Sequence, residues 1–441
     1  AARQGLADVV VGTRSAVFTP LARPGLYIVD EEHDASYKQQ DGFRYNARDL
    51  IVKRAQQDGV PVILGSATPS LESMENVRQG RYRQLLLRQR VRGAAMPKFQ
   101  LLDLGRLPVT SGITPPMLAA LRLRLDRGEQ SIVYVNRRGF APVVLCSTCR
   151  WQARCDRCDV HLTLHRRSER LRCHHCGASR DPPEQCPKCG QSTLHPVGEG
   201  TQRVEDTLQK VLPGVRILRL DSDNTGNAAD LATDLARVRQ GTIDVLVGTQ
   251  LVAKGHDFPA VTLVCILNAD SGLYSVDFRA AERLYQQLTQ VAGRAGRAER
   301  PGQVLVQTRH PENVSLFRLA RHDYNGFVTA ELDQRRLAFC PPFIRFALLR
   351  AESLRPAVPL EFVSVAARVG HRRLAGQPSQ AVRLMDPVPS PMERKAGRYR
   401  AQLLVTSRAH TPLHRFLDDW LCDLEGLKSG RGVRWSLDVD P

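Results

Sequence analysis

The chain has 441 residues, and at about 150 residues per domain this length predicts about three domains, each with its own core. Hydrophobic residues make up 42% and charged residues 24%, proportions that exclude a fibrous repeat and a largely disordered chain. Lys and Arg (63) outnumber Asp and Glu (45), and the net charge of +18 indicates a polyanionic partner, nucleic acid first and an acidic membrane second. No apolar run approaches the ~18 residues that cross a bilayer, so an integral membrane protein is excluded as well.

Residues 1–105 alternate short β-branched runs with polar or Gly-rich segments. The runs at 9–11, 26–29 and 60–64 predict strands, buried on both faces of a parallel sheet. The second run is followed by a cluster of carboxylates that begins with Asp30 and Glu31. In a nucleotide hydrolase, one acid at such a strand end holds magnesium and the next can polarise the attacking water. The third run ends in Gly65-Ser66-Ala67-Thr68-Pro69, whose hydroxyls suit a hinge between two lobes. Taken alone, each segment also fits a plain surface turn.

Eight of the 11 cysteines lie between positions 146 and 189, as four Cys-x-x-Cys pairs. Two such pairs can grip one tetrahedral ion, so the eight thiolates predict two closed structural zinc sites. The spacing leaves the pairing open but favours a nested arrangement, with an inner ion on Cys155, Cys158, Cys173 and Cys176 and an outer ion on Cys146, Cys149, Cys186 and Cys189. The alternative, four disulfides in a secreted module, fits poorly because no secretion signal is present and the other three cysteines are scattered.

A second series of apolar runs, at 131–135, 215–220, 243–247, 261–267 and 303–307, predicts another parallel sheet, into which the cysteine segment is inserted. After Pro341-Pro342 the pattern changes. Runs at 346–351 and 402–406, separated by a basic helical stretch, predict a small α+β domain. We therefore divide the chain into the segments 1–105, 106–145, 146–195, 196–335 and 336–441.

Two polar motifs follow strands or helices of this second series. The segment from Val247-Gly248-Thr249 to Lys254-Gly255 is suited to gripping a phosphate of a nucleic-acid backbone. Further along, Arg294 and Arg297 lie three residues apart, so on a helix both guanidiniums can point at a γ-phosphate. An isolated Arg-x-x-Arg is also typical of a solvated basic face.

Four segments resemble, in chain order, motifs II, III, V and VI of superfamily 2 helicases. They are the acids at Asp30, the turn Ser66-Ala67-Thr68, the segment from Gly248 to Gly255, and the segment from Gln290 to Arg297. With the eight-cysteine insertion, the chain is similar to one family, the bacterial primosomal replication-restart helicases (PriA, primosomal protein N′). Further matches are Gly12-Thr13-Arg14-Ser15-Ala16, Asp30-Glu31-Glu32-His33, Val135-Asn136-Arg137-Arg138-Gly139-Phe140 and Leu437-Asp438-Val439-Asp440-Pro441. The resemblance implies an α/β protein with two RecA-like parallel-sheet lobes, the first incomplete, a two-zinc insertion in the second lobe, and a small α+β C-terminal domain.

The resemblance also implies roles for single residues. The implied cofactors are ATP and Mg²⁺ beside the two zinc ions. The residues that would act on the nucleotide are Asp30, Glu31, Gln290, Arg294 and Arg297. Ser66 and Thr68 would couple the two lobes. DNA would be contacted by Thr249 and Lys254 and by an aromatic-rich loop, where Phe43, Arg44, Tyr45 and Arg48 can stack bases and neutralise phosphates; the alternative for Phe43 and Tyr45 is packing. Arg398 and Gln402 would bind the acidic tail of single-stranded-DNA-binding protein, unless they lie on a solvated basic strand edge.

The implied function is that of an ATP-dependent 3′-to-5′ DNA helicase of replication restart. It would act on forked and single-stranded DNA with other primosome proteins, in the bacterial cytoplasm at the nucleoid and without a membrane partner. No Gly-Lys-Thr or Gly-Lys-Ser phosphate loop occurs in the 441 residues. We therefore expect a fragment that alone neither binds ATP tightly nor unwinds DNA. The alternatives are a non-catalytic, zinc-dependent scaffold for DNA and primosome proteins, and an RNA-directed helicase, which would not predict the cysteine insertion.

Overall fold

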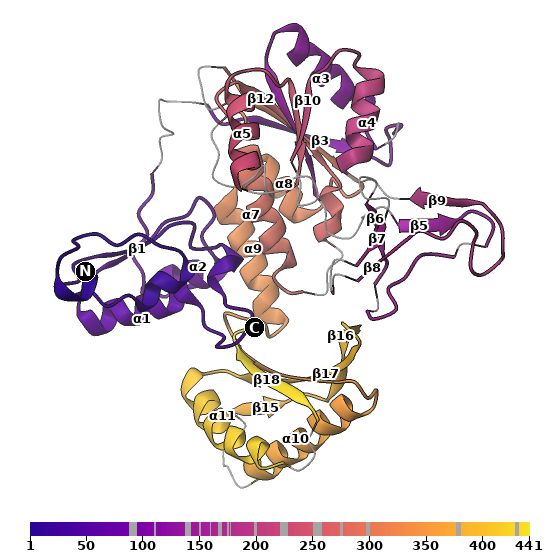
Figure 1. Cartoon of the computed structure of the whole chain (residues 1–441). Helices are drawn as coiled ribbons and strands as arrows, with labels where there is room; N and C mark the ends of the chain where they lie inside the picture. Colours follow the sequence, from indigo (N-terminus) through magenta and orange to yellow (C-terminus); the bar gives the residue numbers. More distant parts are fainter. Residues whose placement is uncertain are drawn as a thin grey trace.

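The computed structural model groups the chain into two lobes, a cysteine-rich module and a C-terminal domain, arranged around long central helices (Figure 1). It describes residues 1–87, 95–109, 112–136, 143–149, 151–158, 160–165, 170–173, 176, 178–197, 201–220, 228–249, 258–273, 277–296, 300–375, 381–427 and 432–441. None of the described helices is both long and apolar enough to cross a membrane.

The first lobe is small and is built on two parallel strands, β1 (Tyr27–Val29) and β2 (Val62–Leu64). Helix α1 (Ala47–Asp58) begins at an Asn46 side-chain cap and ends at Gly59, whose φ of 66° suits glycine. Helix α2 (Leu71–Arg78) begins at a Ser70 cap, and the short 3-10 helices are η1 (Ala2–Gln4), η2 (Arg14–Phe18) and η3 (Ala35–Tyr37).

The strand predicted at 9–11 is wrong. These residues form no strand, and the side chains of Val9 and Val11 are 78% and 92% exposed. β propensity depends on pairing and packing with neighbouring strands, and none of the described strands pairs with this run.

The second lobe contains a parallel six-stranded sheet with the order β10-β11-β4-β12-β13-β3 in the described chain. All five predicted strands are present. The strand bounds are β3 (Lys98–Asp103), β4 (Gln130–Val135), β10 (Ile217–Leu220), β11 (Val245–Gly248), β12 (Val261–Leu267) and β13 (Gln303–Thr308). One assignment needs correction: β3, which the division of the chain placed in the first segment, pairs with β13 over its whole length and so belongs to the second sheet.

Helices cover both faces of this sheet, which explains its uniformly apolar strands. In β4, Ile132 and Tyr134 face one core while Val133 and Val135 face the other. One face is covered by α3 (Pro115–Asp126) and α4 (Thr201–Val211), the other by α5 (Ala228–Arg239), α7 (Ala280–Ala292), α8 (Val314–Ala320) and α9 (Tyr324–Leu337).

The cysteine-rich module lies between β4 and α4, as the predicted insertion requires. Its antiparallel sheet has the order β8-β7-β6-β5-β9 among the described strands. The strands are β5 (Val143–Cys146), β6 (Thr163–His165), β7 (Arg170–Arg172), β8 (Ser179–Arg180) and β9 (Leu194–Val197).

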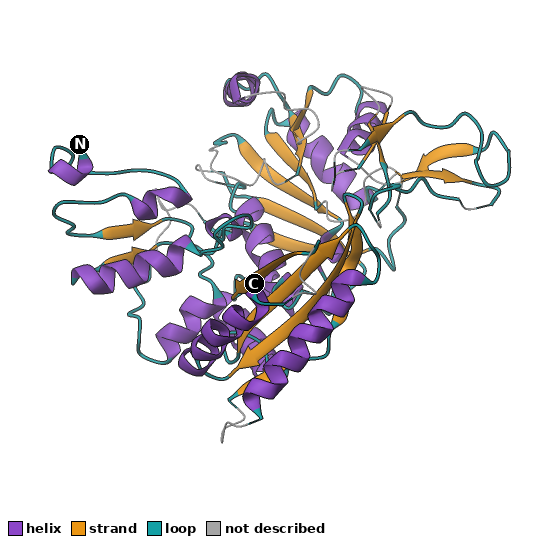
Figure 2. Cartoon of the chain, turned by 60° about the horizontal axis from the view of Figure 1, so that its bottom comes forward, coloured by secondary structure: helices purple, strands orange, loops and turns teal. Residues whose placement is uncertain are grey.

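The C-terminal domain is the predicted α+β unit. Its antiparallel strands carry two helices on one face (Figure 2). Trp420 and Phe362 belong to the core between the helices and the sheet. The elements are β14 (Arg345–Ser353), α10 (Val358–Leu374), β15 (Val382–Leu384), β16 (Val388–Lys395), β17 (Arg398–Ser407), α11 (His410–Glu425) and β18 (Arg434–Val439).

Candidate functional site

The acidic cluster lies where the first lobe's two strands end. Backbone bonds between Gly65 and the residues around β1 hold the two ends together: Gly65 N–H donates to Val29 O at 2.8 Å, and Glu32 N–H to Gly65 O at 3.0 Å. Asp30 is exposed and its Oδ1 accepts from the Glu31 N–H at 3.0 Å. The Glu31 side chain is half exposed, so both carboxylates face solvent at the carboxyl edge of a parallel sheet. This is the position in which the sequence predicts magnesium and water chemistry.

One imidazole connects this cluster to the second lobe. His33 Nδ1 lies 2.6 Å from Ser66 Oγ, and His33 Nε2 lies 3.1 Å from Gln290 Nε2 on α7. Since the Gln290 amide nitrogen donates, His33 Nε2 accepts and the imidazole proton is on Nδ1, which donates to Ser66. Thr68 N–H donates to the same hydroxyl at 2.9 Å. His33 thus links three of the predicted motifs, a role that its place at the end of the acidic run does not reveal.

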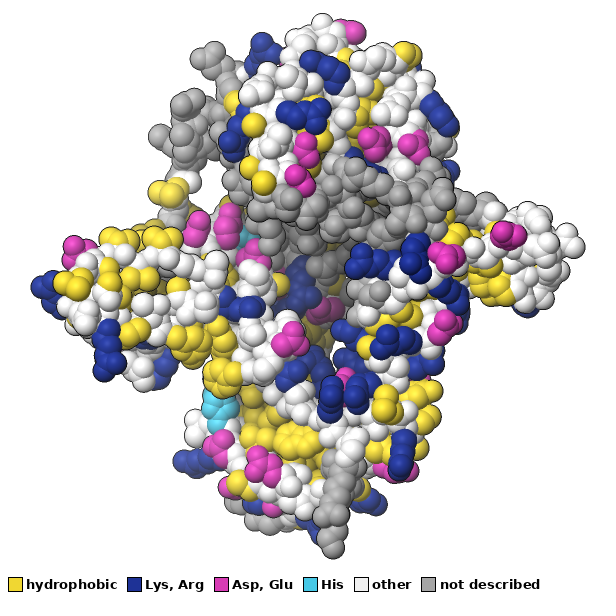
Figure 3. Space-filling model, in the orientation of Figure 1, with side chains coloured by type: hydrophobic (Ala, Val, Ile, Leu, Met, Phe, Trp, Pro, Cys, Tyr) yellow, Lys and Arg dark blue, Asp and Glu magenta, His cyan; other side chains and the backbone are white. Residues whose placement is uncertain are grey.

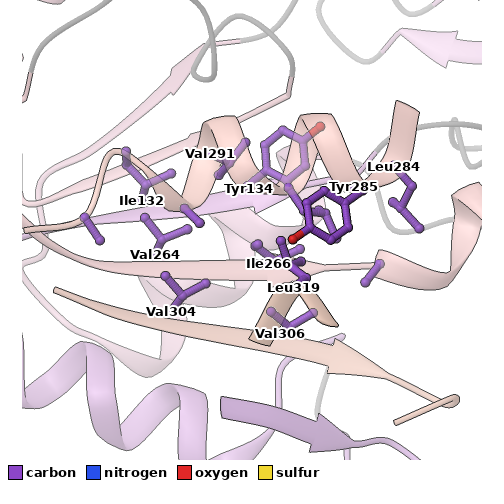
Figure 4. Packing of buried hydrophobic residues seen from close by; sticks show 14 of the residues in the cluster. Ile132, Tyr134, Val264, Ile266, Leu284, Tyr285, Val291, Val304, Val306 and Leu319 are labelled. Carbon is purple, nitrogen blue, oxygen red and sulfur yellow. The ribbon is translucent and has the colours of Figure 1, made fainter. Parts of the chain in front are cut away.

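Helix α2 anchors the first lobe in the core of the second. Leu71 and Met74 belong to the apolar cluster that Figure 4 shows between the sheet and α7. Leu71 N–H donates to Glu282 Oε1 at 2.9 Å, and Tyr324 on α9 donates to the Pro69 carbonyl. The buried Thr68 contributes its carbonyl, which accepts from Gln286 Nε2 at 3.4 Å. Thr68 therefore lies at the contact between the lobes, and Ser66 is connected to the second lobe through His33. Their coupling role stays a prediction.

Buried ion pairs complete this contact. Arg279 pairs with Glu72 across the lobes, and Arg335 lies 2.8 Å from Glu282 and 3.3 Å from Glu331. Burial alone would raise the pKa of Glu72, but Arg279, Arg48 and Arg335 hold that pKa well below its usual range. The Arg279 and Glu72 side chains are each 19% exposed, whereas those of Arg335 and its two partners are at most 10% exposed. The three charges of the Arg335 set therefore stabilise the contact only together, because removing one leaves the others uncompensated.

Arg48 does not fit its predicted role in DNA binding. Its Nη1 donates to Ser70 Oγ at 2.7 Å and to Glu32 Oε2 at 3.2 Å, and its Nε donates to Asp49 at 2.8 Å. Glu32 is itself buried and accepts from the Ser70 N–H at 2.5 Å. The guanidinium therefore neutralises a buried carboxylate inside the lobe, and we remove Arg48 from the predicted DNA surface.

The aromatic-rich loop presents one ring to solvent. Phe43 is 75% exposed and stacks on Tyr45, with ring centroids 5.8 Å apart. Tyr45 packs edge-on against Phe18 at 4.8 Å, and Arg44 Nε donates to the Gln40 carbonyl at 3.0 Å. Phe43 can therefore accept a base on its face, while Tyr45 mainly supports it from below.

The second-lobe candidates are described in part. Thr249 follows β11, is half-buried, and donates its N–H to the Leu220 carbonyl at 3.4 Å. Arg294 lies just after α7 and is 8% exposed. Lys254 and Arg297 lie outside the described residues, so their predicted roles stay predictions.

The eight cysteines form two groups of four whose sulfur atoms lie within 4.8 Å of one another. The groups are Cys146, Cys149, Cys186 and Cys189, and Cys155, Cys158, Cys173 and Cys176, which confirms the nested pairing. Sulfur separations of 3.5 to 3.7 Å match the ~3.8 Å edge of a tetrahedron with bonds of about 2.3 Å to a metal. They are far too long for disulfides, which overturns that alternative. The donor set and geometry fit a tetrahedral thiophilic metal.

Arg398 and Gln402 share the sheet face opposite α10 and α11. Along β17, Ala401, Leu403 and Val405 are buried, whereas Arg398, Arg400 and Gln402 alternate with them and stay half-exposed. Burial, and then the neighbouring Arg350, lower the pKa of Arg400. Figure 3 shows Lys and Arg side chains gathered where the cysteine-rich module approaches this domain. Glu352 on β14 lies opposite Arg400, with its Oε1 3.8 Å from Arg398 Nε, and the role of Arg398 and Gln402 in peptide binding stays a prediction.

Family models match three parts of the chain. Residues 336–441 match the primosomal protein N C-terminal domain, 155–180 the PriA DNA helicase Cys-rich region domain, and 197–299 the helicase conserved C-terminal domain. Replication restart protein PriA of Haemophilus influenzae is 41% identical over 441 residues, covering 100% of this chain and 60% of that protein. PriA of Bacillus subtilis is 38% identical over 439 residues, covering 98% of this chain and 54% of that protein. These 441 residues belong to the PriA family.

The family resemblance seen in the sequence is thus confirmed along the whole chain. The Cys-rich model covers the inner four-cysteine group, and the C-terminal model begins at the end of α9. The chain spans less than two thirds of the curated relatives that it matches, for example 60% and 66% of two of them.

Proposed function

We propose that this chain is the motor and partner-binding part of an ATP-dependent DNA helicase that acts in replication restart. The observation that carries the proposal is the series of contacts from Ser66 through His33 to Gln290. Because His33 Nδ1 also lies 3.5 Å from Glu31 Oε2, this series connects the exposed acids with the helix that leads to Arg294. A shift of one lobe would move the acids and this helix relative to each other, which is the coupling that a nucleotide-driven motor needs. The proposed polarity is 3′-to-5′, and the proposed location is the bacterial cytoplasm at the nucleoid.

In this proposal, Asp30 holds Mg²⁺ and Glu31 orients the attacking water. Arg294 and Arg297 face the phosphates from the second lobe, and Gln290 is linked to the acid cluster through its contact with His33. The Gly-Lys-Thr or Gly-Lys-Ser loop that would cradle the phosphates is not among these residues. Nucleotide turnover is therefore proposed for a form of the protein that also carries this loop, and not for the 441 residues alone.

The proposal also assigns ligands to the other surfaces. Zinc is the metal that suits two four-thiolate sites in a small polar module. Forked and single-stranded DNA would contact Phe43, Arg44 and Tyr45, together with Thr249 and Lys254. Arg398 and Gln402 would receive an acidic peptide, such as the tail of single-stranded-DNA-binding protein, and so bring the helicase to other primosome proteins.

Replacing His33 by alanine tests the coupling. We expect DNA-stimulated ATP hydrolysis, by a form of the protein that also carries the phosphate loop, to fall about 10- to 100-fold, because Ser66 and Gln290 lose the imidazole that contacts both. His371→Ala, an exposed position on α10, is the matched control and should leave turnover unchanged. Normal turnover in His33→Ala, measured on protein that retains its DNA affinity, would refute the coupling.

Replacing Phe43 by alanine tests the DNA surface. A base stacked on an aromatic ring contributes about 1–3 kcal/mol, so the affinity of the 441-residue chain for a labelled thymidine oligonucleotide should fall at least about 5-fold. Fluorescence anisotropy measures this. Phe317→Ala removes a ring on α8 that is 42% exposed and should have no effect. Equal losses in both variants would show that the loop has no special role.

A further inference from the structure

A turn of the C-terminal domain contacts the inner four-cysteine group. Ala396 and Gly397 connect β16 to β17, and the Ala396 N–H donates to Cys158 Sγ at 3.0 Å. The Gly397 N–H donates to the Arg157 carbonyl at 2.7 Å. The residues joined by the first bond are 238 positions apart, so these contacts connect two separately folded units.

The geometry of the turn explains how it presents two donors. Ala396 has a φ of 52° and Gly397 a φ of 80°, the left-handed pair of a two-residue hairpin turn, between the paired residues Lys395 and Arg398. Glycine adopts this conformation freely, whereas alanine is strained in it by about 1 kcal/mol. Ala396 is the strained residue, and its N–H is the one that donates to Cys158 Sγ, so this hydrogen bond compensates the conformational strain of Ala396.

A bound metal would make this sulfur a strong acceptor. Four thiolates around one divalent ion carry a net charge of about −2, and N–H donors to such sulfurs are charge-assisted hydrogen bonds. A protonated thiol is a weak acceptor by comparison. The hairpin also carries Lys395 and Arg398 beside its tip, whose positive charge is complementary to the metal–thiolate group.

We propose that the inner cysteine site is the docking point of the C-terminal domain, and that its metal occupancy fixes the position of the β16–β17 tip. The metal-loaded Cys158 and the Arg157 carbonyl receive the tip. Arg398, which follows the tip directly, is thereby placed at a fixed position beside the module. The inference rests on the metal binding in the proposed function, and is independent of the motor.

Hydrogen exchange on the 441-residue chain separates the two cysteine groups. Cys176→Ser disables the inner site at a cysteine that the tip does not touch, and Cys189→Ser disables the outer site as its matched control. We expect exchange of the tip amides to rise at least 10-fold in Cys176→Ser and to stay unchanged in Cys189→Ser. Unchanged tip protection in Cys176→Ser would overturn the proposal, as would equal loss in both variants.

A second variant changes the turn of the C-terminal domain and leaves all the cysteines in place. Gly397→Val strains the turn at a position with open space around it, and Gly128→Val imposes the same kind of strain far from the module. One of the two bound ions should pass to a chelator several-fold faster in Gly397→Val, and at the native rate in Gly128→Val. Identical release in both would overturn the docking. Metal analysis that finds no zinc would instead count against the metal assignment itself.

Discussion

Replacing Arg335 by methionine is expected to destabilise the contact between α7 and α9 by about 3–5 kcal/mol. Arg335 is 2% exposed and lies between Glu282 and Glu331, and Glu282 also accepts the Leu71 N–H that begins α2. Methionine keeps the apolar stem but removes the charge, which takes from Glu331 its paired cation and leaves Glu282 with only the charge of Arg279 nearby. Since Glu282 also holds the first lobe, α2 should loosen together with α9.

The free energy of opening, measured by hydrogen exchange of α7 and α9, tests this prediction. Arg106→Ala removes an arginine that is 88% exposed in its pair with Asp103, and should change stability by less than about 0.5 kcal/mol. A comparably small effect in Arg335→Met would show that the ion pairs do not determine the stability of the contact.

The pH dependence of Arg335→Met gives a second check. Burial raises the pKa of Glu331 even with Arg335 beside it, and loss of the guanidinium should raise that pKa further. A carboxyl group with a raised folded pKa binds its proton more tightly in the folded protein than in the unfolded one. The destabilisation of the variant relative to the unsubstituted protein should therefore shrink as the pH falls from 7 toward the unfolded pKa of about 4.3. A destabilisation that instead stays constant or grows as the pH falls through this window would contradict the assignment.

Withdrawal of both metal ions is expected to unfold the cysteine-rich module and leave the six-stranded sheet folded. The module's apolar cluster is small and consists in part of the cysteines themselves, Cys155, Cys158 and Cys173 among them. Metal binding in comparable small sites contributes about 10–16 kcal/mol of apparent free energy, more than this cluster can replace.

Hydrogen exchange before and after a strong chelator measures the effect. Protection over 143–197 should be lost while β4, β12 and β13 keep theirs, and metal analysis should show two ions released per chain. Cys422→Ser, which alters an exposed cysteine outside both groups, should change neither quantity. A module that stays protected without metal would show that its own packing is sufficient.

The sequence by itself determined the elements whose pattern is local. Uniformly apolar runs are typical of strands buried on both faces, and all five predicted for the second lobe are present, with bounds shifted by a residue or two. The Cys-x-x-Cys spacing required close ligand pairs, and the nested grouping followed it. The motif order was sufficient to indicate the family.

Only the tertiary structure decided which segments meet. The run at 9–11 has strand propensity but pairs with none of the described strands, and β3 joins the second sheet because β13 pairs with it. Arg48 turns inward to the buried Glu32, and His33, which contacts Ser66, also contacts Gln290, 257 positions further along the chain. Composition and periodicity describe a residue's preference for a helix, a strand or an interior. Ion pairs and hydrogen bonds between distant segments depend on how whole units pack, and short sequence windows carry no information about that packing.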